Sequence, residues 1–141
     1  MEELATLKEY IEAENYREAL VLIDELEAMS KEDKLQKIRS YFVVMLVHLI
    51  KQSAEQRTTR SWDFSIRNAA REVKYINKRR KSGGYYASEI ELRELIEEAY
   101  PTAIDKASLE ALEGAYTETQ LEAMIDVAQI KAKALALATE S

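Results

Sequence analysis

The segment YFVVMLVHLI, residues 41–50, decides how this chain folds, and His48 is its only polar residue. A helix that crosses a bilayer needs about 20 apolar residues, and this segment has ten. It is therefore predicted to be a helix segment that protein encloses on all sides, with no membrane span. We expect an all-α fold, an antiparallel helical bundle around a central buried helix over about residues 31–53.

The composition points the same way. The chain has 141 residues, with 3 Gly and 1 Pro, so it lacks the turn residues that a sheet protein needs every 8 to 12 residues or so. It has no Cys, which excludes disulfides and thiolate metal sites and agrees with a reducing compartment. The first ten residues are acidic where a signal peptide is basic and then apolar, so a cytoplasmic location is expected.

The length fits a single domain over residues 1–141. Within it we expect a core bundle over about residues 3–81 and a C-terminal helical part over about residues 85–139. The two adjacent glycines Gly83 and Gly84 form the expected flexible joint between these parts, because glycine adopts positive φ readily.

Cap patterns predict where the helices begin. A Ser, Thr or Asn that accepts hydrogen bonds from the next turn marks a start, and an acid or Gln three residues on can strengthen it. These patterns predict helix starts after Asn15, Ser30, Ser61, Ser88 and Thr117. Pro101 should end or kink the helix before it near Tyr100, and Gly114 should end a short helix that follows.

Apolar residues at spacings of three and four predict which helix faces are buried. Such stripes are Leu4, Leu7 and Ile11 in the first helix, and Ala19, Leu22, Ile23, Leu26 and Met29 in the second. The last helix, opening at Thr117, ends in the alanine-rich segment 130–141, which has few large side chains to bury. We expect that end to project, fray or pack on a second subunit, so a homodimer through the C-terminal helix is one expected form of self-association.

The charge is unevenly distributed. The chain carries a net charge of -6, yet residues 57–81 hold nine Lys or Arg against two acids, which is +7. In a helix from Trp62 to about Arg80 the apolar residues share one side and a basic ridge lies opposite. The candidate contacts for a partner or an anion are Arg60, Arg67, Arg71, Lys74, Lys78, Arg79, Arg80 and Lys81.

Three uses of this ridge are open. Its cations can pair with acidic residues of the protein itself, either within the fold or across a dimer. It can bind an acidic protein partner, or it can grip phosphates while Tyr75, Tyr85 and Tyr86 stack on bases. At the start of the helix, Arg60, Ser61 and Trp62 form either an anion-binding corner or a cap with a core anchor, and we favour the cap.

His48 is the only histidine in the chain. We expect a structural polar site in which it is hydrogen-bonded to Asp24 or Glu25 on a neighbouring helix. A metal site or a catalytic site would need further ligands at set spacings, and the sequence contains no such pattern. We therefore expect no cofactor and no catalytic activity.

Several short blocks carry a resemblance to a known family. HLIK at 48–51 is followed by RSW at 60–62, SIR at 65–67 and REV at 71–73. Together with LIDELE at 22–27, EAY at 98–100 and the YT and QL pairs at 116–117 and 120–121, they resemble the domain-of-unknown-function 29 family, small helical proteins abundant in cyanobacteria. Gln52 stands where many members have Trp, and Gly114 with Ala115 replaces a Cys-Pro pair.

The resemblance covers about residues 7–126 and implies an all-α fold with no assigned activity. From the residues themselves we expect a protein-protein interaction or regulatory module whose candidate surfaces are the basic ridge and the C-terminal helix. The alternative is sequence-independent nucleic-acid binding through the basic helix 57–81.

Overall fold

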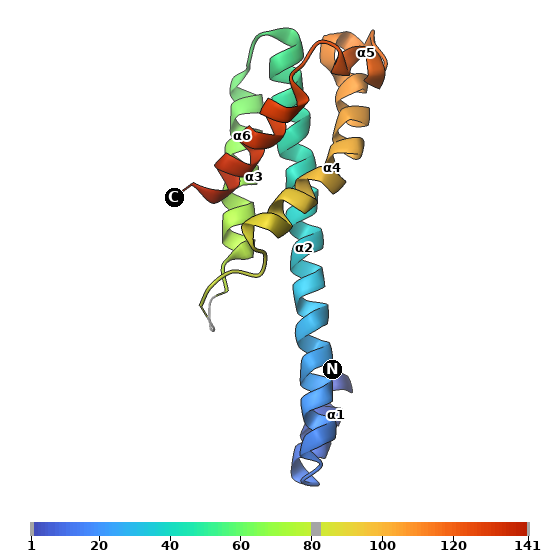
Figure 1. Cartoon of the computed structure of the whole chain (residues 1–141), viewed down its shortest axis with the longest axis vertical. Coiled ribbons are helices and arrows are strands. Elements are labelled where there is room, and N and C mark those ends of the chain that lie inside the picture. Colours follow the sequence, from blue (N-terminus) through green and yellow to red (C-terminus); the bar gives the residue numbers. More distant parts are fainter. Residues whose placement is uncertain (1, 80–82, 141) are drawn as a thin grey trace. The chain divides into compact units, whose positions relative to one another are not determined.

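The structure of the protein, a computed structural model, describes residues 2–79 and 83–140. Within these residues the regular elements are α-helices and one short 3₁₀ turn (Figure 1). They are α1 (Glu2–Glu12), α2 (Tyr16–Glu55), α3 (Arg60–Asn77), α4 (Glu89–Glu110), η1 (Ala111–Gly114), α5 (Glu118–Glu122) and α6 (Val127–Thr139). The predicted all-α class is confirmed.

The chain divides into two compact units, Met1–Lys34 and Leu35–Ser141. Residues on both sides of the expected joint belong to the second unit. Gly83 and Gly84 do adopt positive φ, 73° and 72°. The expectation of a single domain over the whole chain stays a prediction.

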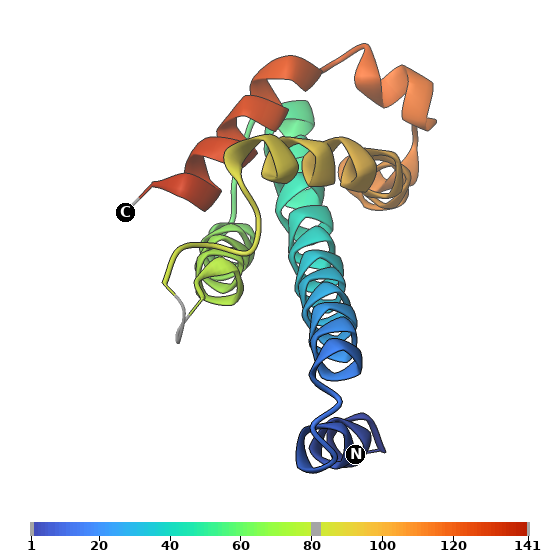
Figure 2. The same ribbon diagram turned by 60° about the horizontal axis from the view of Figure 1, so that its bottom comes forward.

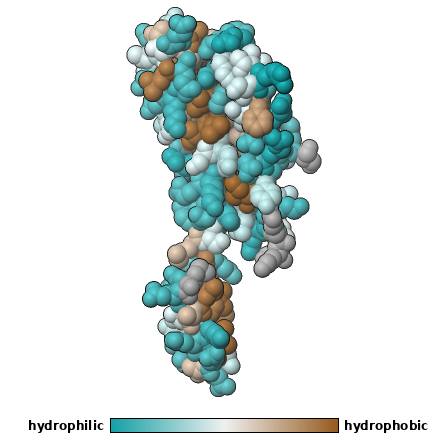
Figure 3. Space-filling model, turned by 180° about the vertical axis from the view of Figure 1, so that it is seen from behind, coloured by the Kyte–Doolittle hydropathy of each residue, from teal (hydrophilic) through white to brown (hydrophobic). Residues whose placement is uncertain are grey.

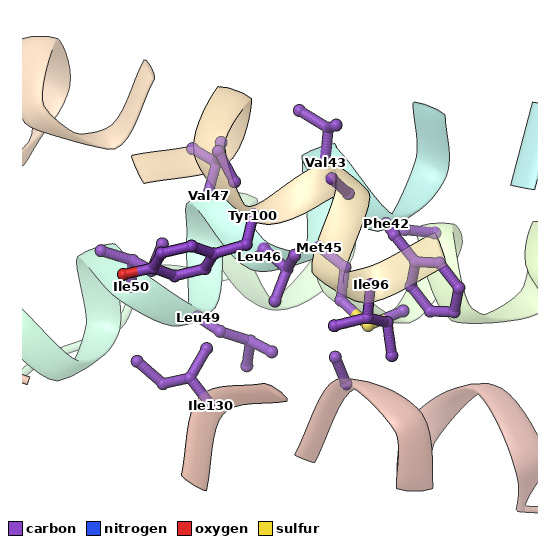
Figure 4. Close-up of a cluster of buried hydrophobic side chains, with 14 of the residues drawn as sticks. Phe42, Val43, Met45, Leu46, Val47, Leu49, Ile50, Ile96, Tyr100 and Ile130 are labelled. Carbon is purple, nitrogen blue, oxygen red and sulfur yellow. The ribbon is translucent and has the colours of Figure 1, made fainter. Parts of the chain in front are cut away.

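The core of the second unit forms around the segment at residues 41–50. Phe42, Met45 and Leu46 have no exposed surface, and they point toward Ile96 of α4 in Figure 4. One expectation for this segment is wrong, because protein does not enclose it on all sides: Val44 is 40% exposed. That side of α2 borders solvent, so the core covers the helix only in part.

Helices α4 and α6 cover one side of the second unit (Figure 2). Helix α6 packs against both α3 and α4. Small residues of both helices are buried in this unit, namely Ala134 and Ala138 of α6 and Ala99, Ala103 and Ala107 of α4. The alanine-rich C-terminal segment is therefore part of the core of this unit.

This packing corrects the prediction for the C-terminal helix. The capping box of Thr117 and Gln120 forms as predicted, but the helix it opens, α5, ends at Glu122. Asp126 then caps α6 by accepting a hydrogen bond from the backbone N–H of Gln129. A second cap along the chain starts a new helix, so the single last helix expected to open at Thr117 is two helices, α5 and α6.

Helix α2 also differs from the prediction, because it runs from Tyr16 to Glu55 with no break at Ser30. The expected central helix over about 31–53 is thus the second part of one longer helix. Residues 16–55 contain neither Gly nor Pro. Ser and Asp inside a helix cost only a few tenths of a kcal/mol relative to Ala, up to about 0.7, so a cap-like pattern at Ser30 does not end the helix.

Helix α4 passes through Pro101 and continues to Glu110. The helix does not end near Tyr100, but its axis changes direction along its length (Figures 1 and 2). Proline removes the hydrogen bond to the carbonyl of Glu97, at a cost of about 3 kcal/mol or more. Both Pro101 and Glu97 are exposed, while buried residues on either side, such as Ala99, Tyr100 and Ala103, hold the helix in place.

The first unit is a helical hairpin of α1 and the beginning of α2. The turn between them includes Glu14 at a φ of 63° and a backbone hydrogen bond from Asn15 N–H to Tyr10 O of 2.8 Å. The helix after the turn begins at Tyr16, as predicted. Of the expected buried stripe only Ala19 is buried, and Met29 is exposed.

Among the described residues, every helix is too short or too polar to cross a membrane.

Candidate interaction surface on helix α3

Helix α3 separates an apolar face from a basic one, as the sequence predicts. Its buried side chains are Ile66, Ala69, Ala70, Val73 and Asn77. The helix begins two residues earlier than expected, at Arg60, since the cap is the side chain of Thr59, which accepts a hydrogen bond from the backbone N–H of Trp62. Ser61 lies in the first turn of the helix.

The exposed face of α3 carries what we call the basic stripe: Arg60, Phe64, Arg67, Arg71, Tyr75 and Lys78. These residues follow one another at spacings of three and four. At about 100° per residue those from Arg60 to Tyr75 fall within roughly 80° of the helix circumference. Phe64 is 53% exposed and Tyr75 is 62% exposed, so large aromatic rings and cations alternate along one exposed line.

The cations of the predicted ridge differ in their surroundings. Lys74 donates a hydrogen bond to the backbone carbonyl of Glu140, 3.0 Å away, and Arg79 lies over the ring of Tyr86. Arg80 and Lys81 lie outside the described residues. In the part of the chain that the structure describes, Arg60, Arg67, Arg71 and Lys78 are exposed.

These four cations also share a second property. Their side chains make no hydrogen bond, ion pair or ring contact with any described residue. Within the described part of the second unit, direct contacts with acids therefore do not neutralise these four cations. The uses of the ridge that the sequence leaves open stay predictions.

A buried asparagine holds the C-terminal end of the stripe. The side chain of Asn77 accepts a hydrogen bond from Ala87 N–H at 2.7 Å and donates one to Ala87 O at 3.2 Å. The backbone adds bonds from Tyr86 N–H to Asn77 O and from Arg79 N–H to Gly84 O. The chain leaving α3 is thus tied to the start of α4, which fixes the direction of the stripe at Lys78.

The N-terminal end of the stripe lies beside a Trp62 cluster. The ammonium of Lys51 and the guanidinium of Arg57 each lie 4.8 Å from the ring centre of Trp62. Lys51 is buried and forms an ion pair of 3.1 Å with Glu110. Cation–π contacts and an ion pair therefore join α2, α3 and the end of α4.

The same corner contains a carboxylate in the first turn of α3. Asp63 accepts hydrogen bonds from the side chains of Thr58, at 2.8 Å, and Gln52, at 3.2 Å. Gln52 thus links α2 to this turn. A carboxylate already stands near the helix N-terminus, where an anion would bind. The cap at this corner is made by Thr59, so the expected cap at Ser61 is wrong.

Glu55 fastens the end of α2 to η1. Its carboxylate accepts hydrogen bonds from Leu112 N–H at 3.1 Å and from Arg57 Nε at 2.9 Å. The hydrogen bond from Leu112 lowers the pKa of Glu55 below its usual value; partial burial acts against this, and Arg57 and Lys51 support it. The charged form of Glu55 is therefore the one that the fold stabilises.

His48 contacts the backbone of its own helix. Its Nδ1 lies 2.8 Å from the backbone oxygen of Val44, one turn back. Asp24 and Glu25 lie in the first part of the same helix α2, which has no turn at Ser30. The polar site of His48 with Asp24 or Glu25 stays a prediction.

An open groove of about 550 Å³ runs between α4 and α6. Its lining combines the apolar side chains of Ile96 and Leu135 with two ion pairs, Arg93 with Glu89 and Lys131 with Glu97. His48 is not part of the lining. Among the described residues, three or more His, Cys, Asp or Glu side chains nowhere gather closely enough to hold a metal ion.

Sequence reasoning missed Phe64 as a surface residue. The signal was present, since Phe64 lies four residues after Arg60 and three before Arg67, which places a large apolar ring on the charged face of an amphipathic helix. An apolar residue there gains nothing from the core. Its exposure together with the cations makes the basic stripe a candidate interaction surface.

Comparison with known proteins identifies a family for this chain, but the family has no assigned activity. The model of the family described as Domain of unknown function DUF29 matches residues 8–131. No curated protein and no solved structure matches the chain significantly.

Proposed function

The chain belongs to the DUF29 family of domains of unknown function, and on that premise we propose that it is a non-catalytic interaction or regulatory module. In this proposal the basic stripe of α3 binds an acidic surface of another protein. The cytoplasmic location expected from the sequence remains part of the proposal.

One observation carries this proposal. Arg60, Arg67, Arg71 and Lys78 are exposed on one line without a partner among the described residues, although the chain as a whole has a net charge of -6. Like charges held close together without counter-charges destabilise a fold slightly. A partner that supplies carboxylates removes this repulsion, and Phe64 and Tyr75 add apolar contact of the kind that strengthens protein interfaces.

We leave catalysis out of the proposed function. The remaining catalytic alternative would use His48, whose Nδ1 is engaged by the carbonyl of Val44. No acid or nucleophile is hydrogen-bonded to its ring in the described part of the chain.

Nucleic-acid binding is the second candidate. It is favoured by the alternation of rings and cations, since bases stack on aromatic side chains while Arg and Lys neutralise phosphates. It predicts that binding weakens steeply with salt, with a slope of about -0.7 per neutralised phosphate on single strands. Fluorescence anisotropy with a labelled single-stranded oligonucleotide at low salt tests it directly.

The test of protein binding compares two double charge reversals. The stripe variant is Arg67→Glu with Arg71→Glu; the matched control is Lys106→Glu with Lys133→Glu, two exposed cations outside the stripe. The partner captured from cell extract is purified and its affinity for each variant is measured by calorimetry. We expect the stripe variant to lose at least about tenfold in affinity, about 1.4 kcal/mol, and the control to bind as the natural chain does. Equal binding by both variants would refute the proposal.

A further inference from the structure

The hairpin of residues 2–34 has apolar side chains that it does not bury. Helix α1 has no buried residue, and Ala19, 4% exposed, is the only buried residue of the hairpin among those described. Its exposed large apolar side chains are Leu4, Ile11, Tyr16, Leu20, Val21 and Met29, and Figure 3 shows apolar surface over the hairpin. Units of fewer than about 40 residues usually need association or cross-links to be stable.

The same hairpin is strongly acidic. Residues 1–34 contain eleven Asp or Glu and four Lys or Arg, a net charge of -7, whereas residues 35–141 contain 15 acids and 16 bases, a net charge of +1. The net negative charge of the chain therefore resides in the unit that also leaves apolar side chains uncovered. A surface that is both acidic and apolar complements one that is basic and aromatic.

We propose that the hairpin of one copy of this chain docks on the basic stripe of a second copy. This inference rests on the proposed function, because it names the partner of the same stripe. The carboxylates of the hairpin face Arg60, Arg67, Arg71 and Lys78, and its apolar side chains cover Phe64. Two such contacts, each hairpin on the other copy's stripe, give a dimer with twofold symmetry.

Charge decides between this arrangement and the obvious competitor, in which two hairpins pair as a four-helix bundle. Pairing hairpins brings a net charge of -7 against another of -7, and like charges at an interface oppose association. The stripe offers the hairpin a surface of opposite sign. It also uses the cations for which the described part of the fold supplies no partner.

Charge-swap complementation tests the inference on full-length protein. The hairpin variant is Glu9→Arg with Glu12→Arg, two exposed acids of α1, and the stripe variant is Arg67→Glu with Arg71→Glu. Light scattering during size-exclusion chromatography gives the mass of the particle at two salt concentrations. Charge interactions are screened weakly at about 0.05 M salt and strongly at about 0.5 M salt. Circular dichroism melting shows whether each variant remains folded.

We expect the natural chain to be a dimer at low salt that salt weakens. Each variant alone should raise the dimer dissociation constant at least about tenfold. An equimolar mixture of the two variants should recover a heterodimer, because reversed stripe and reversed hairpin again have opposite charges. A variant that had merely lost its fold would not form this heterodimer, so recovery of the heterodimer excludes misfolding as the cause of the weaker association.

Three results would overturn the inference, and they differ from a failure of the proposed function. If the natural chain is a monomer, no second copy docks; if the stripe variant dimerises as the natural chain does, the hairpins pair with each other. If the mixture recovers nothing, the two surfaces do not meet. In each case the calorimetric comparison with a separate captured partner still decides whether the stripe binds proteins at all.

A chemical cross-link gives an independent readout. The chain has no Cys, so Ile11→Cys and Phe64→Cys introduced in separate copies create the only two thiols in the mixture. A short bis-maleimide should join unlike copies in preference to like ones. Predominant coupling of Ile11→Cys copies to each other would indicate paired hairpins and contradict the proposed contact.

Discussion

The two units of the chain, residues 1–34 and 35–141, have the same kind of sequence and different interiors. In both, apolar residues recur at the spacings of an amphipathic helix. In the second unit this pattern is matched by buried side chains from α2, α3, α4 and α6, whereas in the first only Ala19 is buried. Periodicity thus identifies the face of a helix that can be buried, and the neighbouring surface decides whether it is.

The largest expected difference between the units comes from removing one large side chain in each. Phe42→Ala in the second unit deletes a ring with no exposed surface and should lower the free energy of unfolding by about 3–5 kcal/mol. Leu20→Ala in the first unit removes a side chain that is 62% exposed and should change it by less than about 0.5 kcal/mol. Urea unfolding of both variants measures this, at a protein concentration where the chain is monomeric.

Similar losses for both variants would mean that the first unit is packed as tightly as the second in solution. The comparison between the units would then fail.

Two glycines of the second unit differ in the space around them, and this difference predicts unequal effects of alanine substitution. Gly114 has a φ of 72°, and a Cβ there would lie 2.9 Å from the backbone oxygen of Leu109; Gly83 has a φ of 73° and no described atom within 4 Å of such a Cβ. Gly114→Ala should therefore cost about 2–3 kcal/mol, since strain and a backbone clash add. Gly83→Ala should cost about 1 kcal/mol from strain alone.

Thermal unfolding of the two glycine variants separates these contributions. Equal losses of stability would show that the turn after α4 shifts to make room for the added methyl group. The backbone at this end of the second unit would then be more adaptable than the 2.9 Å contact indicates.

The smallest expected effect concerns pH and Glu55. Its folded pKa is lowered from an ordinary value of 4.5, so its contribution to stability is present above pH 4.5 and is lost as the pH falls through the folded pKa. Glu55→Gln should lower the free energy of unfolding at pH 7 by about 1 kcal/mol. The difference from the natural chain should shrink on acidification.

Urea titrations from neutral to acidic pH measure this difference, with Glu94→Gln, an exposed acid on α4, as the matched control. A constant difference across the whole range would show that the charge of Glu55 contributes nothing and that only the shape of the side chain does.

The local parts of the fold were predictable. The capping boxes of Ser88 with Glu91 and of Thr117 with Gln120 form as predicted, because a cap depends on hydrogen bonds within one turn. Helix α2 begins at Tyr16 as predicted. The basic face of α3 also follows from the sequence, since it needs only helical periodicity.

The errors concern choices that a local pattern leaves open. Ser30 has the residues of a cap but sits inside α2, because helical hydrogen bonds on both sides outweigh the local preference. Of the two outcomes predicted for Pro101, a helix end is wrong, since Pro101 sits inside α4, and the change in direction of α4 agrees with a kink (Figures 1 and 2). The turn expected at Ser30, which the prediction for His48 with Asp24 or Glu25 assumed, is absent from α2. The exposed position of Phe64 was readable from spacing and was overlooked.

The sequence by itself determined the helical class, two of the capping boxes, the central apolar segment and the separation of charge between residues 1–34 and 57–81. These follow from backbone hydrogen bonding, side-chain periodicity and composition, which act over a few residues. Only the tertiary structure decided that α6 packs against α3 and α4, that four cations of the stripe stand without partners among the described residues, and that the hairpin leaves six large apolar side chains exposed. Burial is a property of two surfaces that meet, and the sequence of either surface alone does not contain the other.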